Sequence, residues 1–316
     1  MEGYRGLENN YDDEKNIMNE NLSTTLRVSK EEADFRLDKL LAAIFPDRSR
    51  NKWQKLIRSG NVKVDEGERK PSYTVSTGEK ISVRVPADFD SDRLVPQDLS
   101  LDIVHEDPTL IGVNKPDGMV VHPGPGHEKG TLANGLIHRY DRLPKLPDPT
   151  RPGIVHRLDK DTSGVLAVAR TEAGYLDLKE QFKKRETEKV YLAVVEGHFD
   201  EEGGMINAPV GRSSKDKTKM TVKLGGKDSR TEFSILEELD NASLLRVKPL
   251  TGRTHQIRVH MSYIGHKILG DSYYGGPQHE RLMLHSKRLT LRHPENGDII
   301  SLEAPEPEEF REMRKN

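Results

Sequence analysis

The sequence predicts an α+β protein in which a small α/β domain precedes a larger domain with a mixed, largely antiparallel sheet. The N-terminal part shows two helical patterns followed by short alternating strands. A polar segment with two prolines, Pro86 to Leu99, then marks a boundary. Beyond it, short apolar segments separated by Gly and Pro outnumber the helical patterns, which favours a sheet-rich domain. We therefore expect a tail at 1–23, a small domain at 24–86, a linker at 87–99 and a large domain at 100–312.

The composition excludes several classes of protein. The 316 residues include 50 Lys and Arg, 52 Asp and Glu and no Cys, which gives a net charge of −2. Without cysteine there is no disulfide framework, thiolate metal site or cysteine nucleophile. No apolar run approaches the roughly 18 residues of a membrane span, and the N-terminus lacks the apolar region of a secretion signal. We expect a cytoplasmic protein without a membrane span, monomeric by default.

Composition predicts the character of the N-terminal tail, and the spacing of apolar side chains predicts the two helices after it. Residues 1–23 are polar and mainly acidic and have little to bury, so we expect them to be disordered. The apolar residues of the first helix recur at helical spacing up to Phe45, and they are Ala33, Leu37, Leu40, Leu41 and Ile44. Ser49 is a suitable N-cap for a second helix, which carries Trp53, Leu56 and Ile57 and ends at Gly60.

A short hairpin and a basic surface complete the small domain. Val62 and Val64 alternate with a lysine, a turn follows at 65–67, and 80–85 forms a last strand. Basic side chains line the helical part, and they are Arg36, Lys39, Arg48, Arg50, Lys52, Lys55 and Arg58. They fit either a solvated helix face or a surface that contacts RNA phosphates without reading bases.

The large domain contains six candidate strands and two candidate helices. The strands are 101–104, 110–113, 165–169, 190–195, 231–236 and 244–247. A helix at 173–184 is expected to turn Leu176 and Phe182 inward. A second helix starts at Thr254 and ends at Gly265, with Ile257, Met261 and Ile264 inward.

The segment His156–Gly164 concentrates charge against a buried strand. Its sequence is His-Arg-Leu-Asp-Lys-Asp-Thr-Ser-Gly, and the apolar run 165–169 follows directly. Charges at a strand end are costly to desolvate unless they are paired or used in chemistry. The segment is therefore either a solvated turn with Asp/Lys pairs or a functional site. A positioned, ionised carboxylate such as that of Asp159 is a competent nucleophile.

Two resemblances favour a functional site. The string His156–Gly164 resembles the catalytic motif of RNA pseudouridine synthases of the large-subunit ribosomal (Rlu) family, and the segments 113–124, 189–197 and 250–261 follow in the family's order. The segment 49–64 resembles the S4 RNA-binding domain. The likeness runs from about residue 25 to 310, and the pairing of an S4-like domain with the large domain most resembles the type D members.

The resemblance implies an enzyme that isomerises uridine to pseudouridine in structured RNA, with ribosomal RNA as the expected partner. It assigns Asp159 as the nucleophile on a flipped-out uridine and Arg157 as the side chain that occupies the vacated space. Tyr191 would stack on the uracil and exchange a proton, and Arg258 would keep Asp159 ionised. The isomerisation needs no metal, nucleotide or redox cofactor.

Other residues receive secondary roles. The resemblance makes Lys115 and His156 supporting residues, and we expect Arg253 to contact backbone or phosphate. The RNA-binding residues of the small domain would be Arg48, Arg50, Lys52, Lys55 and Arg58. His255 and His260 are five residues apart, unlike a helical zinc pair, so we interpret them as hydrogen-bonding residues rather than metal ligands.

Several alternatives stay open at this level. A glycosidase could use Asp159 and Asp161 as paired carboxylates, and an S4-like protein could bind RNA without catalysis. The Lys-, Ser- and Gly-rich stretch 212–230 predicts a mobile loop, either solvated or a clamp on RNA phosphates. The sequence does not choose among attack at C6, attack at C1′ and a glycal route, nor does it specify which uridine is the target.

Overall fold

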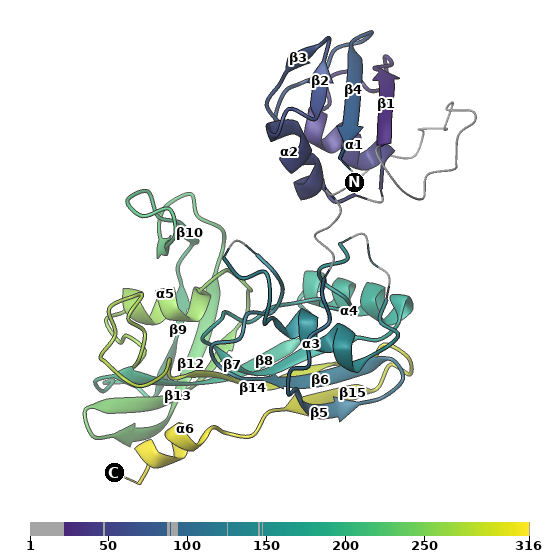
Figure 1. Ribbon diagram of the computed structural model, residues 1–316. Coiled ribbons are helices and arrows are strands. Elements are labelled where there is room, and N and C mark those ends of the chain that lie inside the picture. Colours follow the sequence, from purple (N-terminus) through teal and green to yellow (C-terminus); the bar gives the residue numbers. More distant parts are fainter. Residues whose placement is uncertain are drawn as a thin grey trace. The chain divides into compact units, whose positions relative to one another are not determined.

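The chain divides into two compact units at Arg93 and Leu94, within the predicted linker. The computed structural model describes residues 22–46, 48–86, 89, 94–124, 126–144, 146 and 148–315 (Figure 1). Most of the predicted disordered tail lies outside the described residues. Leu22 and Ser23 belong to a strand, because they pair with Val85 and Arg84, so the small unit begins slightly earlier than predicted.

The N-terminal unit is a four-stranded antiparallel sheet with two helices. Its elements are β1 (Leu22–Arg27), α1 (Leu37–Ile44), α2 (Arg50–Arg58), β2 (Val62–Val64), β3 (Gly67–Glu68) and β4 (Lys80–Val85). The strand order is β1-β4-β2-β3. Strand β1 has no counterpart in the prediction because its sequence, Leu-Ser-Thr-Thr-Leu-Arg, shows little alternation between apolar and polar residues.

Helix α2 forms as its sequence indicates. The Ser49 side chain accepts a hydrogen bond from the backbone N–H of Lys52, which caps the helix. Trp53, Leu56 and Ile57 are all buried in the core of the unit, where Trp53 is 0% exposed. The predicted cap and the predicted inward face are both confirmed.

A buried carboxylate joins the two helices of this unit. Asp38, which is 0% exposed, accepts hydrogen bonds from Arg36, Arg50 and Gln54. Burial alone would raise the pKa of Asp38, but these three donors outweigh it and hold the pKa at about 2. The negative charge is therefore stabilised by partners on and next to both helices.

The C-terminal unit is organised on one nine-stranded sheet. The strands along its path are β5 (Asp102–Glu106), β6 (Leu110–Lys115), β7 (Ser163–Ala169), β14 (Leu284–Arg292), β8 (Glu188–Glu196), β13 (Ala242–Pro249), β12 (Arg230–Leu239) and β9 (Gly203–Asn207), and β15 (Ile299–Glu303) pairs with β14. Of the pairs in this sheet, β7–β14 runs parallel and the others run antiparallel. The predicted α+β class with a mixed, largely antiparallel sheet is confirmed.

Helices cover both faces of the sheet at β7. These helices are α3 (Leu132–Arg139) and α4 (Glu172–Lys184), and the unit also contains α5 (Gln256–Tyr263) and α6 (Glu308–Met313). Leu166 and Val168 of β7 pack with α3, whereas Val165 and Ala167 pack with α4. Because both faces are covered, all seven residues of β7 are buried, which explains the unbroken apolar run at 165–169.

The inward face of α4 differs from the prediction at one position. Leu176 is 63% exposed, while Leu178 is fully buried and Phe182 packs beside it. Tyr175, Leu178 and Phe182 are spaced three and four residues apart and therefore share one face, which leaves Leu176 off that face. None of the described helices is both long enough and apolar enough to cross a membrane.

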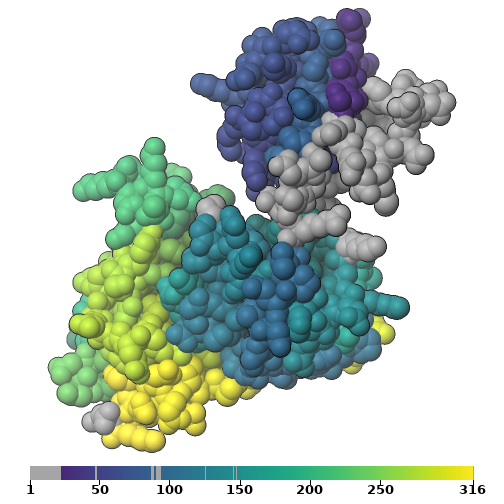
Figure 2. Space-filling model, viewed as in Figure 1, coloured from purple at the N-terminus to yellow at the C-terminus, as the bar shows by residue number. Residues whose placement is uncertain are grey.

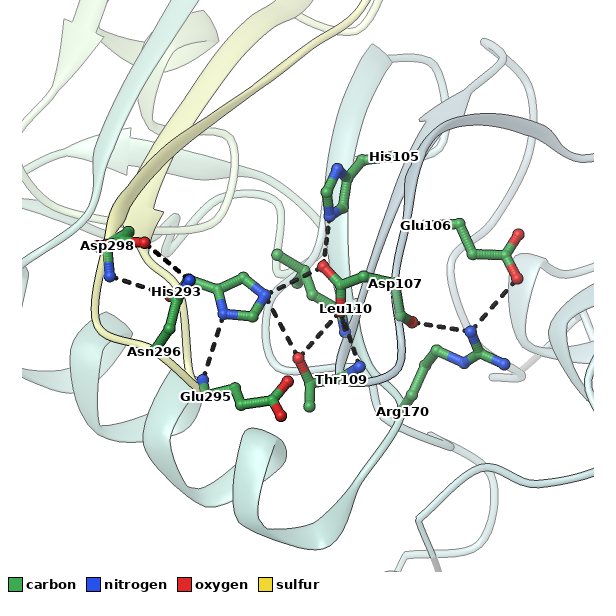
Figure 3. Close-up of polar contacts among 10 residues, drawn as sticks. All are labelled: His105, Glu106, Asp107, Thr109, Leu110, Arg170, His293, Glu295, Asn296 and Asp298. Carbon is green, nitrogen blue, oxygen red and sulfur yellow. Dashed lines mark hydrogen bonds and ion pairs between the residues drawn. The ribbon is translucent and has the colours of Figure 1, made fainter.

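A carboxylate holds two turns of this unit together at one end of the sheet (Figure 3). Asp107 accepts hydrogen bonds from the backbone N–H groups of Thr109 and Leu110, and its other oxygen lies 2.6 Å from Nε2 of His105 and 3.0 Å from Nε2 of His293. Burial would raise the pKa of Asp107, but these contacts hold it well below its usual range. The β5–β6 turn is thereby tied to the turn between β14 and β15.

The basic stretch 212–230, predicted as a mobile loop, contains regular secondary structure. It contains most of a hairpin of β10 (Val210–Arg212) and β11 (Met220–Val222), which projects from the C-terminal unit (Figures 1 and 2). Its contacts with the rest of the unit include a hydrogen bond from the Met220 N–H to the Tyr274 hydroxyl and one from the Arg253 guanidinium to the carbonyl of Asp228. These partners lie outside the stretch, so its own composition could not indicate them.

Candidate active site

A glycine fixes the charged segment at the end of β7. Gly164 has φ of +111°, and a Cβ at this position would lie 2.2 Å from the carbonyl oxygen of Ser286. The close approach arises from the parallel pairing of β7 with β14, in which Ser163 and Gly164 face His285 and Ser286. Only glycine fits there, and it places the segment that carries Asp159 at the end of a central strand.

Asp159 lies where two cavities meet. A cavity of about 460 Å³ and a second of about 260 Å³ are both lined by Asp159, Arg157, His255 and Arg258. The Asp159 side chain is 19% exposed, so its carboxylate is accessible but largely shielded from water. Tyr191 and Arg253 also line the larger cavity. The structure thus brings together residues from three separate segments of the sequence.

Arg258 reaches Asp159 with one nitrogen only. Its Nη1 lies 3.8 Å from Oδ2 of Asp159. Its Nε and Nη2 donate to the two carboxylate oxygens of Asp271, at 2.8 and 2.7 Å. Asp271 is 2% exposed, and the bidentate pair fixes the plane of the guanidinium. Asp271 was not predicted, because nothing in the sequence marks a loop residue 13 positions away as the partner.

Tyr191 presents a neutral phenol to the site. It lies on β8, paired in register with Ser286 of β14. Burial raises the pKa of Tyr191 to about 12, with the Ser286 hydroxyl acting to lower it and the charge of Asp159 acting to raise it. At neutral pH the side chain therefore keeps its proton and can donate it.

The two predicted supporting residues, one half-buried and one fully buried, form hydrogen bonds with the backbone. Nε2 of His156 accepts a hydrogen bond from the Ala167 N–H, and its ring stacks on Phe182 at 4.4 Å between centroids. Burial lowers the pKa of His156 to about 3, so the ring is neutral. Lys115 is 0% exposed, and its ammonium donates to three backbone carbonyls, including that of Lys160 next to Asp159. Burial lowers the pKa of Lys115 to about 8.

The two predicted RNA-contacting arginines of this unit differ in their surroundings. Arg157 is exposed, and no hydrogen bond or ion pair joins it to another of the residues described above. Arg253 donates through Nε to the Asp228 carbonyl at 3.0 Å, while its backbone N–H donates to the Gln256 side chain. Arg253 therefore holds the base of the hairpin in addition to lining the cavity.

The predicted RNA-binding residues of the N-terminal unit also have intramolecular contacts. Arg50 is paired with Asp38, and Arg58 donates to Gln54. The Lys55 ammonium lies 5.5 Å from the centroid of the Phe89 ring. Arg48 and Lys52 have partners within the chain as well. RNA binding by these basic residues stays a prediction.

The two histidines of the α5 region make the hydrogen bonds expected of them. Nδ1 of His255 lies 2.9 Å from the Tyr274 hydroxyl, and its Nε2 lies 3.9 Å from Oδ1 of Asp159. His260 contacts the hydroxyl of Thr231 and the carbonyl of Ala208. Within the described part of the chain, no three His, Asp or Glu side chains are placed to hold a metal ion. The contact between His255 and Asp159 was not anticipated from the sequence.

Comparisons with known proteins match each of the two units to a known family. A family model described as RNA pseudouridylate synthase matches residues 109–263, and one described as S4 domain matches residues 35–81. The chain is 40% identical to an uncharacterized RNA pseudouridine synthase of Bacillus subtilis over 294 residues, which is 92% of this chain and 97% of that protein. It is 38% identical to the ribosomal large subunit pseudouridine synthase D of Escherichia coli over 313 residues, 94% of each chain.

A solved structure agrees with these matches. The human RNA pseudouridylate synthase domain containing 1 superposes with a TM-score of 0.56 at 31% sequence identity. The match covers 66% of this chain and 84% of that chain.

Proposed function

The chain belongs to the RNA pseudouridylate synthase family and carries an S4 domain, and from this premise we propose that it converts specific uridines of large-subunit ribosomal RNA to pseudouridine with Asp159 as the nucleophile. Relatives that align over most of the chain are named for that RNA. An enzyme acting on ribosomal RNA needs access to it, so the expected cytoplasmic location belongs to the same proposal, as does action as a monomer.

The main support for the proposal comes from the cavities and side chains around Asp159. Its carboxylate borders two cavities, with Arg258 at 3.8 Å on one side and Tyr191 along the same cavity wall. A nearby guanidinium favours the ionised carboxylate that a nucleophile requires. Arg258 cannot swing to cover Asp159 completely, because two of its nitrogens are bound to Asp271. The carboxylate of Asp159 therefore lies beside a cation and is still accessible.

The remaining residues suit the steps of a uridine isomerisation. Extruding the target base costs roughly a few kcal/mol of stacking, and the exposed Arg157 can enter the space that the base leaves. The N1–C1′ bond then breaks, the C5–C1′ bond forms, the C5 hydrogen leaves as a proton and N1 gains one. Tyr191 offers an aromatic face for the uracil and a phenol that keeps its proton. The route through C6, C1′ or a glycal stays open.

The N-terminal unit supplies affinity rather than chemistry in this proposal. Its basic side chains suit contacts to RNA phosphates, which position an RNA without reading its sequence. Arg50 is 45% exposed, so its pairing with Asp38 leaves part of the guanidinium available to a phosphate. Arg50 would then both stabilise the fold of the unit and bind RNA.

The test replaces each acid of the charged segment separately. Large-subunit ribosomal RNA transcribed with tritium at uridine C5 releases tritium to water when pseudouridine forms. Asp159→Asn should lower the release by more than about 10³-fold, as removal of a nucleophile does, while RNA affinity is retained. Asp161→Asn, which changes an exposed carboxylate two residues away, is the matched control and should stay active.

The same two variants separate the alternatives. Full activity of Asp159→Asn would refute the assigned nucleophile. RNA binding by the wild type without any tritium release would favour the non-catalytic RNA-binding protein. Loss of activity in Asp161→Asn as well as in Asp159→Asn would show that both carboxylates are needed, as the paired-carboxylate alternative requires.

A further inference from the structure

A hydrogen-bonded chain of three residues ends beside the proposed nucleophile, Asp159. The Met220 backbone N–H on β11 donates to the Tyr274 hydroxyl at 3.2 Å, that hydroxyl lies 2.9 Å from Nδ1 of His255, and Nε2 of His255 lies 3.9 Å from Oδ1 of Asp159. The three residues come from the β10–β11 hairpin, the loop before β14 and the residue that precedes α5. The roles that the family resemblance implies for this chain do not include a function for any of the three.

The donors along this chain can be assigned in one consistent way. The Tyr274 oxygen accepts the Met220 N–H, which directs its own O–H toward Nδ1 of His255. Burial raises the pKa of Tyr274 to about 12, so the phenol keeps the proton it donates. Burial lowers the pKa of His255, against the opposing charge of Asp159, so the ring is neutral and has one N–H. With Nδ1 accepting, the ring proton is on Nε2.

The opposite tautomer is disfavoured by charge. A proton on Nδ1 would leave the lone pair of Nε2 facing the carboxylate of Asp159, where no donor would lie between them. In that tautomer the Tyr274 oxygen would accept hydrogen bonds from both Met220 and His255. Its own O–H could then no longer donate to His255. The ring is held in place edge-on to the aromatic rings of Tyr273 and Tyr274, at 5.6 and 5.7 Å between centroids.

We propose that His255 is a positioning residue, fixed by Tyr274 as the Nε2–H tautomer, which donates to Oδ1 of Asp159 during the reaction. Arg258 approaches the other oxygen, Oδ2, so the two partners would together set the plane of the carboxylate. The separation of 3.9 Å exceeds a hydrogen bond, and active-site contacts of this kind commonly tighten only in the reacting complex. This inference rests on the proposed function, because it assumes that Asp159 is the nucleophile.

Two substitutions of His255 separate positioning from a structural role. Gln places its side-chain N–H₂ near the position of Nε2, whereas Asn reaches only as far as Nδ1. His255 has φ of +55°, a region that Asn tolerates better than Gln. A purely structural role therefore predicts that Asn is the milder change, while positioning predicts that Gln is milder. Because the two roles predict opposite orders of severity, the Asn and Gln variants distinguish between them.

The measurement is the single-turnover rate of tritium release from C5-labelled large-subunit ribosomal RNA at saturating enzyme, together with RNA affinity. We expect His255→Asn to slow the rate roughly ten- to a hundredfold, the effect of losing a hydrogen bond to a charged group, with unchanged affinity. His255→Gln should recover most of the rate. An Asn variant as fast as the wild type, or faster than the Gln variant, would overturn the proposal.

A spectroscopic readout does not depend on activity. Nitrogen-15 chemical shifts of the histidine rings distinguish a protonated from an unprotonated nitrogen, and the signals missing in His255→Asn identify His255. We expect the proton on Nε2 in the wild type and a mixture of tautomers in Tyr274→Phe. A proton on Nδ1 in the wild type would overturn the proposal. If the wild type isomerises no uridine, the proposed function is refuted. The measured tautomer of His255 would still test whether Tyr274 donates to Nδ1.

Discussion

The buried Asp38 offers a quantitative test of how the N-terminal unit is stabilised. Its carboxylate accepts from Arg36, Arg50 and Gln54, and its pKa falls from 3.8 to about 2 on folding. At about 1.4 kcal/mol for each pKa unit, this fall corresponds to about 2–3 kcal/mol of unfolding free energy. Because Arg36 and Arg50 are 40% and 45% exposed, water solvates them once Asp38 is changed. The loss should therefore stay well below the roughly 3–5 kcal/mol of a broken, fully buried ion pair.

Asp38→Asn should lower the unfolding free energy of this unit by about 2 kcal/mol at pH 7. The assay is urea unfolding followed by the fluorescence of Trp53, the chain's only tryptophan, which is buried in this unit. A folded pKa below the unfolded value stabilises the protein above the unfolded pKa, and the effect is lost as pH falls. The difference between wild type and variant should therefore shrink between about pH 4 and about pH 2.

Glu31→Gln removes one exposed charge from the same unit and serves as the control, with little expected change. The reasoning would be refuted by an Asp38→Asn variant as stable as the wild type at pH 7. It would equally be refuted by a deficit that persists unchanged at the acid end, because the loss would then come from packing and not from the charge.

Two further predictions concern the framework of the active site. Gly164→Ala should abolish stable folding of the C-terminal unit, seen as lost soluble protein, because its Cβ would lie 2.2 Å from a backbone oxygen. The control Gly118→Ala has a similar positive φ with open space around the Cβ, so it should cost only about 1–2 kcal/mol; equal behaviour of the two variants would contradict the steric argument. Lys115→Met should lower the unfolding free energy by at least about 2 kcal/mol, measured by circular dichroism, because three backbone carbonyls lose their donor. A Met variant with wild-type stability and activity would show that Lys115 does not hold the loop.

The sequence by itself determined those features that depend on neighbouring residues. The Ser49 cap and the inward face of α2 follow from spacing within one helix, and both are confirmed. The α+β class followed from the order of short apolar segments, and the segment around Asp159 was identified because its residues are contiguous. Errors occurred where the local signal was weak, as at β1, or where a helix phase was misjudged, as at Leu176.

Only the tertiary structure decided which groups surround Asp159. Asp271, Tyr274 and His255 meet near it because a nine-stranded sheet and α5 bring separate loops to one place. The same holds for Lys115, whose ammonium is bound to a carbonyl 45 residues away. Hydrogen bonds and charge pairs form between groups that are close in space, whatever their separation along the chain. Local patterns therefore predict elements and contiguous motifs, while the partners that orient a side chain depend on how the whole chain packs.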